Sequence, residues 1–158
     1  MRTMRRKDRE VTDINEKMEI INNCNVVRLA IKDKEGLYIV PLNFGYSYLD
    51  SKLTLYCHSA KEGRKIDAIA ENSEVAFEMD CEHKLIEAEL ACLYGFYFKS
   101  IIGNGVASIV EDMEEKKIAL SLLMNHQTGK DFSFEDKHAK AVTIFKVEVT
   151  NFSAKEYK

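Results

Sequence analysis

The sequence has 158 residues, of which 46% are hydrophobic, and carries a formal net charge of −3 at neutral pH. This length favours one domain over residues 1–158, and the apolar content is sufficient for a core and excludes a disordered chain. The acidic balance argues against a general nucleic-acid-binding protein, and residues 1–12 are expected to form a flexible basic arm rather than a binding tail.

Neither a membrane nor an export function is expected from the sequence. No apolar run approaches the roughly 20 residues that span a bilayer, and the first residues lack the apolar core of a signal peptide. The four cysteines show no CxxC spacing. We therefore expect reduced thiols in a cytoplasmic protein without a metal site, since the nearest pair of ligand types, Cys81 and His83, stands alone.

The first predicted elements are a helix and a hairpin. The helix covers residues 13–22 and is capped by Asp13. Two strands follow, over residues 25–33 and 37–48, and the short glycine-containing turn between them is typical of a hairpin. Pro41 interrupts the second strand and cannot donate a ladder hydrogen bond, which indicates an edge strand or a bulge.

The remaining elements alternate between strand and helix periods. A third strand over residues 53–59 leads into a helix within residues 61–72, where apolar residues recur at helical spacing. Later strands are predicted over residues 74–81, 94–112 and 141–149, and a further helix over residues 113–129. Six strands joined mostly by short turns predict a mainly antiparallel β fold with flanking helices, closed into a small barrel.

The junction between the third strand and the following helix reads LYCHSAKEGRK and is a candidate anion site. A helix start presents unpaired N–H groups that bind phosphate, and Ser59 adds a hydroxyl. Arg64 and Lys65 are unfavourable to the helix dipole at this position, as expected if they are directed at an anion. The alternative is a solvated turn. His58 could act as an acid or base, contact a ligand, or pack at the strand end.

Two further stretches are candidate ligand contacts. In VPLNFGY, Asn43 and Gly45 follow a proline within a strand, which indicates close approach of a ligand or an ordinary bulge. YFKSIIGNG contains two glycines but continues as a strand, so it is not a dinucleotide-binding loop. Ser100 could still offer a hydroxyl to an anion.

The order and spacing of HSAKEGRK and SIIGNG resemble the nitroimidazole-resistance protein family, within the pyridoxamine 5'-phosphate oxidase-like flavoproteins. The similarity covers residues 13–155. It implies the FMN-binding split β-barrel, usually a homodimer with flavin in clefts between the subunits. One departure is Lys99 before Ser100, where many members of the family have an aromatic residue leading into this serine.

The resemblance also implies which residues contact the cofactor, FMN or alternatively FAD. Lys65 would bind the flavin phosphate with Arg64 near it. The segment beside the isoalloxazine ring would be Pro41, Leu42, Asn43, Phe44 and Gly45; the ribityl chain and phosphate would contact His58, Ser59, Ala60 and Gly63; and further contacts would come from Ser100, Ile101, Ile102 and Gly103.

The function expected from the resemblance is a flavin-dependent oxidoreductase that reduces a small acceptor such as a nitroimidazole. His58 would be the catalytic residue, donating a hydrogen bond or a proton. Two alternatives stay open: a flavin-binding or sensing module without turnover, and a split barrel that binds haem or a deazaflavin, with His58 as an axial ligand. Neither nucleic acid nor a membrane is expected as a partner.

Overall fold

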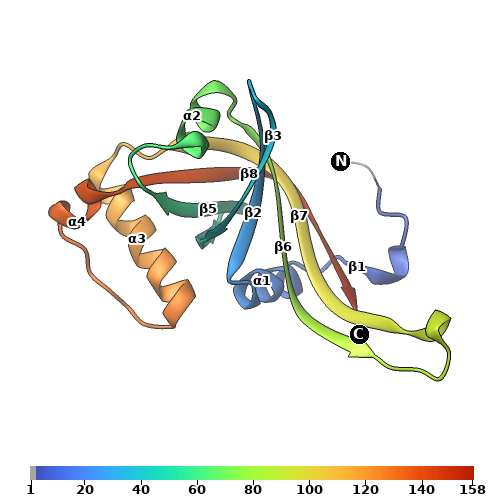
Figure 1. The fold of residues 1–158 in the computed structure, drawn as a ribbon. Helices are drawn as coiled ribbons and strands as arrows, with labels where there is room; N and C mark the ends of the chain where they lie inside the picture. Colours follow the sequence, from blue (N-terminus) through green and yellow to red (C-terminus); the bar gives the residue numbers. More distant parts are fainter. Residues whose placement is uncertain (1–2) are drawn as a thin grey trace.

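The computed structural model describes residues 3–158 and consists mainly of one antiparallel β-sheet with helices around it (Figure 1). The strands follow the order β3-β2-β6-β7-β8-β5-β4, and β1 pairs with β8. The strands are β1 (Glu10–Val11), β2 (Val26–Asp33), β3 (Gly36–Asn43), β4 (Gly45–Leu49), β5 (Lys52–Ser59), β6 (Glu74–Ile86), β7 (Gly95–Ile109) and β8 (Thr143–Tyr157). The helices are α1 (Ile14–Asn23), α2 (Arg64–Glu71), α3 (Met113–Thr128) and α4 (Asp136–Ala141), with 3-10 turns η1 (Lys7–Arg9) and η2 (Ala91–Leu93).

The predicted count of six strands and the predicted closed barrel are both wrong. Over residues 3–158 the sheet has eight strands, and no hydrogen-bonded ladder joins its two end strands β3 and β4. The predicted strand 37–48 is two strands, because the chain breaks at Phe44 and its two halves join opposite ends of the strand order. The two end strands of the sheet, β3 and β4, are therefore joined through Phe44 by the chain itself. No hydrogen-bonded ladder connects them, so the barrel is split at this point.

The break at Phe44 is caused by close packing of α3 on the chain. Phe44 and Gly45 are buried. A Cβ atom added to Gly45 would lie 2.5 Å from Leu123 Cα, so only glycine lets the helix backbone approach so closely. This contact comes from the third helix of the chain, and periodicity along residues 37–48 does not reveal it.

Strand pairing extends nearer to both ends of the chain than the sequence predicts, and residues 1–2 of the predicted basic arm lie outside the described residues. In the predicted arm, residues 10–11 pair with Lys155 and Ala154 of β8. β8 itself continues to Tyr157, beyond the predicted end of the last strand, and α4 is an additional short helix. The predicted cap of the first helix is confirmed, since Asp13 Oδ1 accepts hydrogen bonds from the backbone N–H groups of Asn15 and Glu16 at 2.9 and 3.1 Å.

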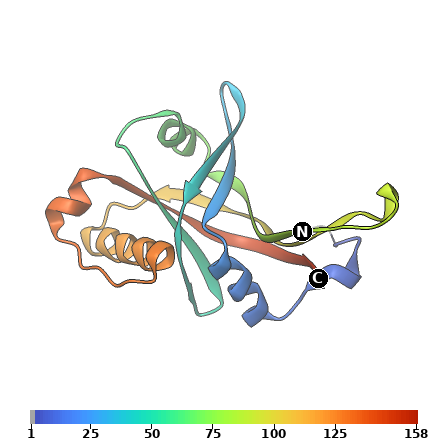
Figure 2. The same cartoon turned by 60° about the horizontal axis from the view of Figure 1, so that its bottom comes forward.

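The core lies on the concave side of the curled sheet, and the other side of the sheet is exposed to solvent. Fully buried side chains include Leu29, Phe77, Met79 and Ile101, and Ile21 of α1 packs against the same cluster. Figures 1 and 2 show α3 beside β5 and the β6–β7 hairpin projecting from the opposite end of the molecule. Among residues 3–158, no helix combines the length and the apolar content needed to cross a bilayer.

Candidate functional site

Ser59 and Lys65 meet at the junction of β5 and α2. Lys65 Nζ donates a hydrogen bond to Ser59 Oγ at 3.1 Å. Ser59 is 5% exposed, the one polar residue among residues 3–158 that is buried, and Lys65 is half-buried. Lys65 has no carboxylate within ion-pair distance in the described part of the chain. The ammonium group is thus fixed by a hydroxyl while its charge stays uncompensated.

The start of α2 adds backbone donors beside this pair. Gly63 is the N-cap and has a φ of +137°, which favours glycine. No side chain caps the helix, and Gly63 O accepts hydrogen bonds from Ile66 and Asp67. The first N–H groups of α2 are therefore free of side-chain acceptors. An ammonium, a hydroxyl and a helix start together fit a flavin phosphate.

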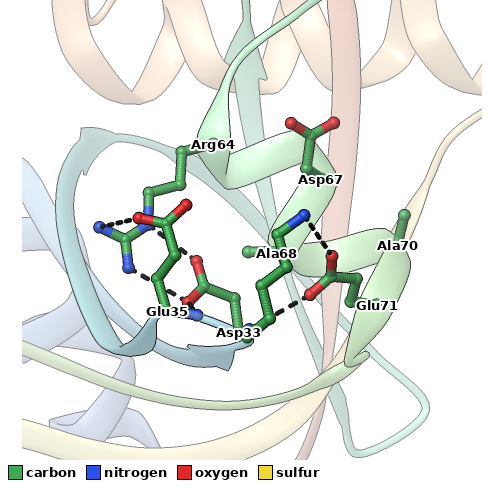
Figure 3. Close-up of a pocket in the computed structure, with 8 residues that line it drawn as sticks. Asp33, Glu35, Arg64, Asp67, Ala68, Ala70 and Glu71 are labelled. Carbon is green, nitrogen blue, oxygen red and sulfur yellow. Dashed lines mark hydrogen bonds and ion pairs between the residues drawn. The ribbon is translucent and has the colours of Figure 1, made fainter.

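Arg64, the other cation at this junction, is turned toward the β2–β3 turn (Figure 3). Its Nε donates to Asp33 Oδ2 at 2.7 Å, and Glu35 lies 3.9 Å from its Nη1. Its guanidinium also stacks 4.5 Å from the centre of the Tyr38 ring. The hydrogen bond from Arg64 lowers the pKa of Asp33. Arg64 is compensated by acidic side chains, so the structure separates the roles of two cations that are adjacent in sequence.

The segment Pro41–Gly45 lies near the end of β5. Gly45 pairs with Tyr56, and His58 follows two residues later on β5. His58 is exposed. Gly45, the last residue of the predicted ring segment, therefore lies beside β5 three residues before Ser59. Arg64 of the predicted phosphate turn contacts Asp33, at the end of the β2–β3 ladder opposite to Asn43. Burial raises the pKa of the neighbouring Cys57 thiol to about 12.

Gln127 of α3 holds this segment in place, and the sequence offers no local signal for it. Gln127 Nε2 donates hydrogen bonds to the backbone oxygens of Asn25 and Phe44 at 3.1 and 3.0 Å. Asn43 Nδ2 in turn donates to Gln127 Oε1 at 3.1 Å. The side chain of Gln127 thus ties α3 to both sides of the break between β3 and β4.

His126, the residue before Gln127, packs under the same segment. Its ring lies 4.6 Å from the Phe44 ring and 5.3 Å from the Tyr46 ring. Nε2 is 2.8 Å from Cys24 O, and Nδ1 is buried without a hydrogen-bond partner. A carbonyl oxygen only accepts, so the proton lies on Nε2. Desolvation lowers the pKa of His126, and this effect is larger than the rise in pKa caused by the hydrogen bond to the Cys24 carbonyl.

The free energy of unfolding is expected to fall as the pH drops below about 6.5, the ordinary pKa of histidine. Because the folded pKa of His126 is lowered, the unfolded chain binds a proton that the folded chain does not, so stability rises with pH. Urea unfolding at pH 7.5, 6.5 and 5.5 measures this dependence. His126→Gln keeps a donor for Cys24 O but does not titrate, so its pH slope should be smaller; equal slopes would contradict this assignment.

The segment Ser100–Gly103 lies far from the phosphate turn within one chain. Ser100 pairs with Lys155 of β8, whereas Ser59 pairs with Thr143 at the other end of the same strand. At about 3.3 Å per residue the two positions are roughly 40 Å apart along β8. One chain therefore does not place all the predicted site residues around one ligand.

Ser100 and Ile102 do share an exposed face of the sheet with Pro41. We call this the outer face; it consists of the exposed sides of β3, β2, β6 and β7. Pro41, Arg28, Glu78 and Ile102 are paired in one row across these four strands. Arg28 Nη1 lies 2.9 Å from Glu78 Oε2 and 2.7 Å from Asp80 Oδ1. This ion cluster between the two predicted segments was not expected, because isolated charges on alternating strand positions resemble an ordinary solvated face.

Lys99, which stands where many members of the family have an aromatic residue, does not lie on the outer face. Lys99 pairs with Cys81 and lies on the side of β7 opposite to Ser100. Its Nζ is 2.9 Å from Glu82 Oε2. Glu82 has a φ of +56° beside the register shift between Cys81 and Lys84. The bulge thus directs Glu82 to Lys99, away from the predicted contacts of Ser100.

A family model described as pyridoxamine 5'-phosphate oxidase matches residues 13–156. The chain belongs to the pyridoxamine 5'-phosphate oxidase family. The match spans α1 to β8 and includes every residue of the candidate site, so the resemblance noted from HSAKEGRK and SIIGNG is confirmed. A search of curated protein sequences found no match.

Solved structures support the same pyridoxamine 5'-phosphate oxidase fold. A candidate 5-nitroimidazole antibiotic resistance protein from Bacteroides thetaiotaomicron is 35% identical, with 93% of this chain and 86% of that chain covered and a TM-score of 0.79. A flavocytochrome from Azotobacter vinelandii is 16% identical over 99% of this chain and 72% of that chain, with a TM-score of 0.78. An FAD- and haem-binding protein from Mycobacterium smegmatis is 15% identical over 95% of this chain and 74% of that chain, with a TM-score of 0.78. The last two show the fold alone.

Proposed function

We propose that this chain is a flavoprotein that binds FMN, or FAD, and acts as an oxidoreductase toward a small acceptor such as a nitroimidazole. The observation that carries the proposal is the uncompensated Lys65 ammonium, held 3.1 Å from Ser59 Oγ at the uncapped start of α2. The match to the pyridoxamine 5'-phosphate oxidase family and the 35% identity to a candidate nitroimidazole-resistance protein support it.

Each part of the site has a defined task under this proposal. Ser59, Lys65 and the first N–H groups of α2 hold the phosphate. The segment Pro41–Gly45, fixed by Gln127, offers backbone groups to the edge of the ring. Bound flavin supplies electron or hydride transfer. His58, exposed at the end of β5, would donate a hydrogen bond or a proton to the acceptor.

A homodimer completes the proposed site. Because Ser100 lies at the opposite end of β8 from Ser59, a second copy must bring its own Ser100–Gly103 segment to the phosphate turn. The outer face is suited to this contact, since it exposes Ile102 and Val106 of β7 as well as Leu37 and Ile39 of β3. A two-fold axis near the row that contains Pro41 and Ile102 would place the outer faces of the two copies against each other. The strands of the two copies would then run in opposite directions, so that one end of each sheet faces the other end of its partner.

The first test is a visible absorption spectrum of the purified protein, followed by heat release and chromatography of the chromophore. A yellow protein that releases FMN or FAD would support the proposal. A colourless protein that also fails to bind added FMN and FAD would contradict it, and a haem Soret band would favour the haem alternative. Anaerobic turnover of a nitroaromatic with reduced flavin then separates an oxidoreductase from a binding module.

His58→Ala is expected to lower the rate of nitroaromatic reduction by roughly 100-fold, the lower end of the usual contribution of a general acid. Flavin content is measured on the same sample and turnover is expressed per bound flavin, because His58 is also among the predicted cofactor contacts. His138→Ala in α4, a remote exposed histidine, is the control. Unchanged turnover by the flavin-loaded His58→Ala protein would remove His58 from the reaction.

A further inference from the structure

Two cysteines that the proposed function does not use, Cys24 and Cys81, lie together where the end of α1 meets β6 (Figure 1). Cys24 is the C-cap of α1 and is 1% exposed. Cys81 is half-buried on β6, and its Sγ lies 3.9 Å from Ile20 O in the last turn of α1. The two thiols are within hydrogen-bonding reach of each other and pack against the same core cluster. The fold thus joins two thiols that are far apart in the sequence.

The neighbours of both cysteines hold this pair in place. Asn23, the residue before Cys24, donates a hydrogen bond from Nδ2 to Glu82 Oε1 at 3.1 Å. Glu82 follows Cys81, which is the last residue of β6 paired with β7 before the register shift. The Cys24 N–H group donates to Ile21 O at 3.2 Å. The backbone on each side is therefore fixed, and the sulfurs need only a small approach to reach the S–S bond length of about 2.05 Å.

Lys99 places a positive charge beside the pair. It stands directly opposite Cys81 in the ladder of β6 and β7, and directly opposite residues of a ladder lie on the same side of the sheet. Burial raises the pKa of the Cys81 thiol, and the positive charge of Lys99 lowers it by a smaller amount. A cation beside a cysteine stabilises the thiolate, which is the form that attacks a disulfide. The position at which the sequence departs from the family pattern thus lies beside the more accessible of the two thiols.

We infer that Cys24 and Cys81 form a thiol–disulfide exchange site, at which a low-molecular-weight disulfide such as oxidised glutathione converts the two thiols into an intrachain disulfide. The Cys81 thiolate, stabilised by Lys99, attacks one sulfur of the small disulfide and releases the first small thiol. Cys24 then attacks the Cys81 sulfur and releases the second. Two protein thiols are oxidised, and one small disulfide is reduced to two thiols, which take up the two cysteine protons. The inference goes beyond the proposed function and does not depend on a bound flavin.

The disulfide would strengthen the support of the segment beside the proposed flavin ring. Cys24 O lies 2.8 Å from His126 Nε2, and Asn25 O accepts a hydrogen bond from Gln127 Nε2. His126 and Gln127 in turn hold Phe44. A covalent link at Cys24 would fix the piece of chain that carries both carbonyl groups. Because a disulfide also restricts the unfolded chain, the oxidised protein should resist heat better than the reduced protein.

Tryptic digestion of the wild-type protein after exchange is the direct test, and it does not depend on the folding of a variant. Folded protein is incubated with oxidised glutathione at pH 8.5, because burial raises the pKa of both thiols, and the remaining thiols are then alkylated. Cleavage after lysine and arginine places the four cysteines on separate peptides, residues 18–28, 53–61, 66–84 and 85–99.

We expect peptide 18–28 to be linked to peptide 66–84 by a disulfide. Three results would each overturn the inference. These are alkylation of both Cys24 and Cys81, glutathione bound to either of them without the link as the final product, and a link from either peptide to a different cysteine.

The rate of disulfide formation tests the part played by Lys99. Lys99→Met removes the charge, and Lys84→Met is the matched control, since Lys84 is exposed and pairs with Tyr97 beyond the register shift. We expect the exchange to be at least about threefold slower in Lys99→Met, because fewer thiolates form. Lys99→Arg, which keeps the charge, should restore the rate. Equal rates for Lys99→Met and Lys84→Met would overturn the role of Lys99.

Thermal unfolding of oxidised and reduced samples tests the link between α1 and β6. We expect oxidation to raise the melting temperature of the wild type by roughly 5–10 °C. Cys92→Ser, which removes an exposed cysteine outside the pair, should show the same rise, and Cys81→Ser should show none. A wild-type melting temperature that does not rise, or an equal rise in Cys81→Ser, would overturn the inference.

Discussion

Gly45→Ala is expected to destabilise the protein by roughly 3 kcal/mol, the upper part of the usual range for overpacking. The added Cβ would lie 2.5 Å from Leu123 Cα and 2.6 Å from Leu122 C. These are backbone atoms of α3, so no side-chain rotation relieves the clash, and the helix must move away from β4. Thermal unfolding followed by circular dichroism should show a melting temperature lower by roughly 6–12 °C.

Gly95→Ala is the matched control for this substitution. Gly95 lies in β7, and an added Cβ there would be 3.4 Å from Ile86 Cδ1, a flexible side-chain atom. Its melting temperature should change by no more than about 2 °C, as for a surface substitution. If Gly45→Ala is as stable as Gly95→Ala, then α3 does not press on the break between β3 and β4, and our explanation of the split strand is wrong.

The displacement of α3 caused by Gly45→Ala should also alter the candidate site. Gln127 and His126 hold Phe44 through α3, so a shifted helix loosens the segment beside the proposed flavin ring. We therefore expect Gly45→Ala to bind flavin more weakly than Gly95→Ala even at temperatures where both are folded. Flavin fluorescence at 15 °C measures this difference.

Lys65→Ala is expected to weaken FMN binding by roughly 10- to 100-fold. Hydrogen bonds to charged groups contribute about 1.5–3 kcal/mol, and about 1.4 kcal/mol corresponds to a tenfold change in affinity. The Lys65 ammonium has no competing carboxylate among residues 3–158, and Ser59 Oγ lies 3.1 Å away. Quenching of FMN fluorescence on titration with the apoprotein measures the dissociation constant.

Two further variants separate a phosphate contact from a general loss of positive charge. Lys61→Ala removes an exposed lysine from the same turn. Arg64→Ala removes the adjacent cation, which is already paired with Asp33 and Glu35. Both should weaken FMN binding by less than about threefold, since screened surface charges contribute little. Equal effects of Lys61→Ala, Arg64→Ala and Lys65→Ala would show that no specific phosphate contact exists at Lys65.

The sequence by itself determined the features that depend on a few neighbouring residues. Asp13 caps α1 because its carboxylate reaches N–H groups two and three residues later. The β2–β3 hairpin turns at Gly36, which has a φ of +121°. The change from strand to helix around Gly63 predicts the phosphate turn for the same reason: hydroxyl, cation and helix start lie within one short stretch.

Only the tertiary structure decided the features that depend on contacts between distant segments. The strand over residues 37–48 divides because α3 packs on Gly45. Arg64 and Lys65 of α2 differ because Asp33 of β2 compensates the charge of Arg64 and not that of Lys65. Ser100 is separated from Ser59 by the length of β8. Periodicity and propensity describe a residue by its neighbours in the chain, whereas burial and charge compensation are set by residues that folding brings beside it.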